Sequence, residues 1–174
     1  MKKLTRIAFV LTAAIAALIA VTSNTGCGIY KFSDASVPDS IKTINIKLVE
    51  NRAQYINPQL APALTEKLRQ KFLSQTKMSQ TNNDNADWEL SCEIRDYSLS
   101  TSAISGQQAA NNRITVGIHI VLNDRKADKI SEHDVSKGFD FKGNQTLQQA
   151  EASLKDEMIR TMTDEIFNQL FSNW

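Results

Sequence analysis

The sequence is poor in the residues that most often carry catalysis or bind metals. Its 174 residues include two cysteines, Cys27 and Cys92, and two histidines, His119 and His133. Neither histidine has another histidine or a cysteine at ligand spacing. No nucleophile elbow, P-loop or dinucleotide-binding glycine motif is present. The sequence therefore offers no catalytic residue, no metal ligand set and no cofactor site, and we expect the protein not to be an enzyme.

Long hydrophobic runs are also scarce, and the one run that stands out lies at the start of the chain. It extends from Ile7 to Val21 without a charge and follows the basic residues Lys2, Lys3 and Arg6. This layout is typical of a secretory signal peptide. A transmembrane helix is the rival interpretation, but it needs about 20 apolar residues to cross a bilayer. We therefore predict a cleaved signal peptide over residues 1–26.

The end of this leader resembles the lipobox of bacterial lipoproteins. Gly26, a small residue, directly precedes Cys27, while Asn24 takes a position that is usually aliphatic. The resemblance implies cleavage before Cys27 and lipidation of that cysteine, followed by a short tether over residues 27–40. Several acyl chains hold a protein firmly at a membrane, whereas a single chain does so only marginally. The alternative is an ordinary secreted protein that is cut elsewhere and carries Cys27 as a plain thiol.

The charge of the remaining chain excludes some partners. All three charges of the leader are basic, so the part from Cys27 onward has 17 Lys+Arg against 19 Asp+Glu. Nucleic acid is therefore not an expected partner, because no strong basic field remains. If Cys27 is acylated, Cys92 has no disulfide partner. Cys92 lies on the apolar side of an alternating segment and is expected to be a small buried side chain; a Cys27–Cys92 bridge is the alternative.

The hydrophobic periodicity predicts an α+β domain over residues 41–174. Alternation with period two indicates strands, and apolar residues spaced by three or four indicate helices. Thr146 and Gln149 form a glutamine version of the capping box at the start of the second helix. The predicted order is β-α-β-β-β-α, a four-stranded mainly antiparallel or mixed sheet with two helices packed on one face. The predicted strands are 43–48, 88–99, 113–122 and 135–142, and the helices begin near residues 60 and 147.

Several segments together resemble the family of lipopolysaccharide-assembly lipoproteins called LptE-like. They span most of the chain after the leader and are diffuse packing patterns: Cys27–Ser33, Lys47–Ala53, Leu64–Phe72, Asn112–Val116 and Ile166–Trp174. The resemblance implies a lipoprotein without enzymatic activity at the periplasmic face of the outer membrane. It further implies a plug in the lumen of an LptD-type β-barrel that helps lipopolysaccharide to reach the outer leaflet. The residue after Cys27 is Gly28 and not an aspartate, which agrees with sorting to the outer membrane.

Other functions remain open at this point. One is a stand-alone periplasmic lipoprotein that binds lipids or glycans, and the least supported is a lipid-anchored hydrolase. If lipopolysaccharide is bound directly, its phosphates require Arg or Lys at a strand or loop rim. Arg113, Lys137 and Lys142 flank the uncharged segment Thr101–Asn112 or lie on the neighbouring strand. We predict these three residues as ligand-binding, and that segment as the part that enters the barrel.

Overall fold

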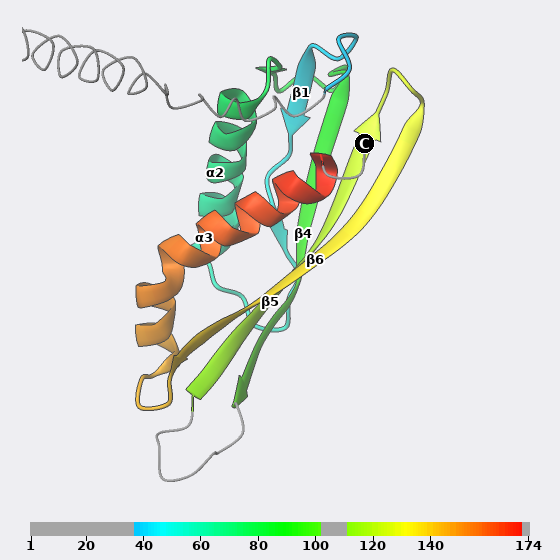
Figure 1. Ribbon diagram of the computed structural model, residues 1–174. Coiled ribbons are helices and arrows are strands. Elements are labelled where there is room, and N and C mark those ends of the chain that lie inside the picture. The colour runs from blue at the N-terminus through cyan, green and yellow to red at the C-terminus, as the bar shows by residue number, and fades with distance from the viewer. Residues whose placement is uncertain (1–36, 102–110, 172–174) are drawn as a thin grey trace, which may run out of the picture. The chain divides into compact units, whose positions relative to one another are not determined.

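The computed structural model describes residues 37–101 and 111–171 (Figure 1). These residues belong to one compact unit, Ser33–Trp174. The predicted signal peptide 1–26, Cys27 and most of the predicted tether lie outside the described residues, and so does the interior of the segment 101–112. Within the described ranges, neither helix combines the length and the apolarity needed to span a bilayer.

The described residues form six strands and two helices. In chain order they are β1 (Thr43–Ile46), β2 (Glu50–Asn51), α2 (Leu60–Gln75), β3 (Ser79–Gln80), β4 (Trp88–Thr101), β5 (Asn111–Asp124), β6 (Lys129–Lys142) and α3 (Leu147–Phe171). The predicted α+β class is confirmed. The predicted number of four strands is too low, because the sheet also contains β2 and β3, which have two residues each. A pair of residues is too short to show an alternation, so the sequence carries no signal for them.

The boundaries of β6 also differ from the prediction, which placed this strand at 135–142 after a charged turn. The turn is shorter, and it contains Asp128 with a positive φ of 49°. β6 already begins at Lys129, and the first half of this strand is largely exposed on both faces. Because neither face is buried there, no apolar alternation marks the start of the strand.

The sheet is mixed, with the order β3-β1-β4-β5-β6. The three long strands β4, β5 and β6 form an antiparallel meander. β1 and β2 lie one after the other along the same edge of β4 and run parallel to it. Between them the edge stays bonded, since Lys47 N–H donates to the Leu90 carbonyl at 2.9 Å. β1 and β2 thus form one interrupted strand along β4, and β3 pairs with the outer side of β1.

Both helices pack on the same face of this sheet (Figure 1). The sequence predicts the buried stripe of α2 correctly, and it predicts most of the stripe of α3. Two predicted members of the α3 stripe, Leu147 and Leu154, are only partly buried. The capping box is confirmed, because Thr146 N–H donates to Gln149 Oε1 at 3.0 Å and Gln149 N–H donates to Thr146 Oγ1 at 3.3 Å.

Cys92 lies in this core as expected. Its side chain is buried, its thiol is free, and burial raises the pKa of the thiol to about 12. A thiol in this state is a poor nucleophile, because only the thiolate reacts. Cys92 therefore acts as a small apolar residue on the helix-covered face.

Aromatic rings join the two helices. The Phe72 ring of α2 lies 5.2 Å from that of Phe167 and 5.8 Å from that of Phe171, both on α3. Phe72 is 1% exposed and Phe167 is also buried, whereas Phe171 is partly buried at the rim of the cluster. The interface of the helices depends on this cluster more than on ion pairs such as Lys71–Asp164, which is partly solvated.

We expect Phe72→Ala to lower the free energy of unfolding by about 3–5 kcal/mol, because it leaves a cavity between the helices. Leu73→Ala is the matched control. Leu73 is the next residue of α2 and is 51% exposed, so its truncation should change the stability by less than ~0.5 kcal/mol. Urea denaturation followed by circular dichroism measures both. Equal effects of the two substitutions would contradict this account of the core.

Candidate functional site

Arg113 lies on the sheet face that carries no helix, where it pairs with Asp140 of the next strand. Its Nε is 2.6 Å from Asp140 Oδ1 and its Nη2 is 2.9 Å from Oδ2, so the contact is bidentate. These hydrogen bonds raise the pKa of Arg113 and lower the pKa of Asp140. Gly138 provides the space, because a Cβ atom there would lie 2.7 Å from Arg113 Cδ. The guanidinium is thereby held flat against β6 while remaining about half exposed.

The other two predicted ligand residues do not both join Arg113. Lys142 is opposite Asn111 in the register and therefore shares the helix-free face with Arg113. Within 37–101 and 111–171 it makes no ion pair, so its charge is available. Lys137 is opposite the buried Val116 and points to the helix side, where its Nζ lies 3.0 Å from Glu165 Oε1 of α3. The structure thus groups Arg113 with Lys142 and separates Lys137; that these residues bind a ligand stays a prediction.

The helix-free face is covered with paired charges. Glu89 lies between Lys47, at 3.7 Å, and Arg125, at 3.0 Å. Glu93 is similarly held between Arg52, at 3.0 Å, and Arg95, at 3.1 Å. Such exposed pairs add little to stability. They do make this face strongly polar, with Glu89 and Glu93 each flanked by two cations.

A hollow of about 750 Å³ opens on this face beside the interruption between β1 and β2. His119 lines it, and its place on the polar side of the alternation in this strand predicts an exposed side chain. It is instead buried: Nδ1 lies 2.9 Å from Asp134 Oδ1, and Nε2 lies 3.7 Å from Glu132 Oε2. Alternation along the strand predicts the face correctly, but it does not show that long neighbouring side chains cover the ring. No cluster of three metal-ligating side chains occurs in the described part of the chain.

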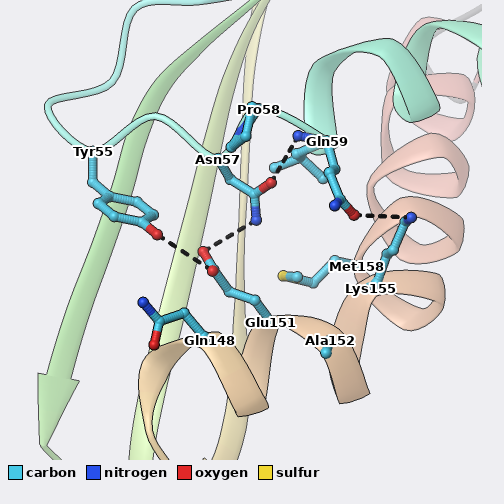
Figure 2. Close-up of a pocket in the computed structure, with 10 residues that line it drawn as sticks. Tyr55, Asn57, Pro58, Gln59, Gln148, Glu151, Ala152, Lys155 and Met158 are labelled. Atoms are coloured by element: carbon cyan, nitrogen blue, oxygen red, sulfur yellow. Dashed lines mark hydrogen bonds between the residues drawn. The ribbon is translucent and has the colours of Figure 1, made fainter.

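A second cavity, of about 330 Å³, lies where the loop before α2 meets the first turns of α3 (Figure 2). Glu151 is its centre. The carboxylate accepts hydrogen bonds from Tyr55 Oη at 3.3 Å, Asn57 Nδ2 at 3.1 Å and Tyr97 Oη at 2.8 Å. Burial and then the bond to Glu151 raise the pKa of Tyr97, so the phenol remains a donor. We call these four residues the Glu151 clamp.

The clamp has a structural role. Both carboxylate oxygens of Glu151 are occupied by neutral donors, and nearby Lys155 Nζ is bound to Gln59 Oε1 at 3.1 Å. The group therefore joins α3 to β4 through Tyr97 and to the loop before α2 through Tyr55 and Asn57, and Figure 2 shows the two bonds to the loop. Sequence reasoning missed it completely. Its other members lie 54 to 96 positions away from Glu151 along the chain, and a single Glu on a helix surface carries no signal for such partners.

On the described surface many charges are ion-paired with neighbours, the one described cysteine is buried, and the carboxylate of the Glu151 clamp already holds its partners. The arrangement offers main-chain edges, a polar face and a few cations. These features suit a protein that docks against another macromolecule.

Comparisons with known proteins agree with this fold. A minor lipoprotein from Acinetobacter baumannii is similar in structure, with a TM-score of 0.51 and 15% identity, over 77% of this chain and 95% of that one. A protein from Xanthomonas campestris is similar with a TM-score of 0.50 and 10% identity, over 75% of this chain and 83% of that one. At such identities the likeness concerns the fold alone. A search of curated proteins finds no match.

The family comparison is more informative. The model of the lipopolysaccharide-assembly family LptE matches residues 41–170. This range covers both helices and all six strands of the described domain, apart from the last residue of α3. The resemblance seen in the sequence is therefore confirmed: the chain belongs to the LptE family of lipopolysaccharide-assembly proteins.

Proposed function

We propose that this protein is a lipid-anchored accessory of an LptD-type outer-membrane β-barrel, which it enters from the periplasmic side to assist the transport of lipopolysaccharide. The observation that carries the proposal is the family match over residues 41–170. No chemical reaction is needed for this role. The protein acts by filling a space and by holding a translocating lipid in place.

The polar face supports a position inside a barrel. The lumen of a large outer-membrane barrel is polar and wet, so a protein that fills it needs a hydrophilic surface. The helix-free face provides such a surface through its paired charges around Glu89 and Glu93. The uncharged segment 101–112 connects β4 to β5, and we propose that this segment enters the lumen.

The leader supports a membrane anchor. The basic start, the apolar run and the Gly26-Cys27 step together suit a lipoprotein signal that is cleaved before Cys27. The proposed acyl chains would hold the domain at the periplasmic face of the outer membrane. The tether up to residue 40 is short, so the folded domain stays close to the bilayer.

We further propose that the protein contacts lipopolysaccharide directly. Arg113 and Lys142 lie on one face at the end of the sheet that borders segment 101–112. Phosphate groups favour guanidinium ions because of the matching bidentate geometry. Lys137 can contribute only from the helix side, where Glu165 already holds it.

The partner is tested by mild detergent extraction of the tagged full chain, followed by mass spectrometry. We expect an LptD-type barrel to co-purify in stoichiometric amount. Another outer-membrane complex, recovered from the same extract, controls for the detergent. If that complex survives while this protein elutes alone, the proposed role is wrong, and the stand-alone lipid- or glycan-binding function takes its place.

The anchor is tested with Cys27→Ala. We expect the leader to remain uncleaved and the incorporation of labelled palmitate to be lost, because the substitution removes the acylated thiol. Cys92→Ala is the matched control and should keep both cleavage and label, since Cys92 is buried. Normal cleavage of the Cys27→Ala protein would contradict lipidation at this position.

The ligand site is tested with Arg113→Glu/Lys142→Glu. A hydrogen bond to a charged group contributes about 1.5–3 kcal/mol, so lipopolysaccharide binding should weaken at least tenfold, and most at low salt. Asp140→Asn is the control, because it releases Arg113 from its partner without removing the cation; binding should be kept or increase. Lys137→Glu, measured separately, tests whether the lysine on the helix side contributes to lipopolysaccharide binding. Unchanged binding in all variants would rule out these residues.

A further inference from the structure

The interrupted strand formed by β1 and β2 stops before β4 does. Its last bond to β4 runs from Arg52 N–H to the Ile94 carbonyl at 2.9 Å, whereas β4 continues to Thr101. The chain then turns away, with Ala53 N–H bound to Asn51 Oδ1 at 3.2 Å, and enters the Glu151 clamp. Among residues 37–101 and 111–171, none pairs with this side of β4 beyond Ile94.

The direction of the backbone shows which groups lie along this edge. The carbonyls of Leu90 and Ile94 point toward β1 and β2, because they accept hydrogen bonds from Lys47 and Arg52. The register against β5 shifts by one residue between Ile94 and Asp96. After this bulge the odd-numbered residues of β4 face outward, so Tyr97, Leu99 and Thr101 present their N–H and C=O groups at the open edge. We call Tyr97–Thr101 the free edge.

The free edge lacks the usual protection. An edge strand is commonly guarded by charged side chains that discourage pairing with another strand. The outer edge of β6 is guarded in this way, with six charged residues among its 14: Lys129, Glu132, Asp134, Lys137, Asp140 and Lys142. The free edge reads Tyr-Ser-Leu-Ser-Thr and has no charge. The free edge therefore lacks the charges that guard the outer edge of β6.

Exposed apolar side chains surround the free edge. Leu99 is 53% exposed, and it lies on the same side of the strand as Tyr97. The Tyr55 ring lies 5.4 Å from that of Tyr97 and is itself 40% exposed, and its neighbour Ile56 is 59% exposed. The opposite side of the strand carries Ser98 and Ser100. A strand placed here would meet apolar groups with one face and hydroxyl groups with the other.

We propose that the free edge accepts an extended segment of the barrel partner as an added β-strand, with alternating apolar and uncharged polar residues. This inference rests on the proposed function and names the docking surface for it. The open N–H and C=O groups are matched only by another extended backbone. The segment comes from a loop or an extension of the barrel, because the strands of a closed wall already use both edges. Thr101 is also the first residue of the segment proposed to enter the lumen, which brings the free edge within reach of such a loop.

The experiment compares substitutions at Leu99 with the same substitutions at Ser136 in the full-length, tagged protein. Leu99→Pro removes an outward N–H and leaves the ladder to β5 intact, and Leu99→Lys adds a guarding charge. Ser136 is opposite Gly117 in the register and occupies an outward, exposed position on β6, so Ser136→Pro and Ser136→Lys are the matched controls. Circular dichroism and thermal unfolding establish that each variant is folded.

We expect both Leu99 variants to recover at least tenfold less barrel than the wild type after detergent extraction, while both Ser136 variants recover a normal amount. If all four variants retain the barrel, the free edge is not the docking surface, although the proposed function stands. If the wild type recovers no barrel, the proposed function itself fails, and this inference fails with it. A dimer of the full chain in light scattering that Leu99→Lys dissociates would make a second copy the occupant and overturn the proposal.

Discussion

The burial of one face of the sheet beneath two helices determines most other properties of the domain. The stripes of α2 and α3 remove the apolar sides of β4, β5 and β6 from water, and burial of this kind is the main favourable contribution to folding. Once that face is filled, the other face must be compatible with solvent or with a polar partner. Its charged side chains accordingly occur as neutralised groups such as Arg52–Glu93–Arg95.

Features that repeat along the chain could be predicted from the sequence. Alternation in β4 and β5 and the spacing from Leu60 to Phe72 have one physical cause, the contact of every second or every third to fourth residue with a common core. The capping box was predictable because both of its partners are local in sequence. The two-residue strands β2 and β3 and the exposed start of β6 were not, since no buried side chain marks their ends.

The predicted ligand residues show where such reasoning stops. Their places beside segment 101–112 or on the neighbouring predicted strand suggested one group, but the face on which a strand residue lies depends on the register, and Lys137 falls on the opposite side from Arg113. The acidic partners Asp140 and Glu165 were also not foreseen. The Glu151 clamp was missed for the same reason: tertiary contacts between isolated polar residues leave no periodic pattern. The residues that resemble the LptE family, in contrast, are distributed over the whole domain, so the family was recognisable from the sequence.

The Glu151 clamp has a consequence for folding kinetics. Glu151 reaches Tyr55 and Tyr97 across 96 and 54 positions of the chain, and β1 pairs with β4 across a helix. A topology with such high contact order closes large loops before it gains the contacts that reward them, which slows folding. Until α3 docks, the apolar face of the sheet stays open to aggregation. A chaperone that covers this open face until α3 docks is therefore expected to raise the yield of folded protein.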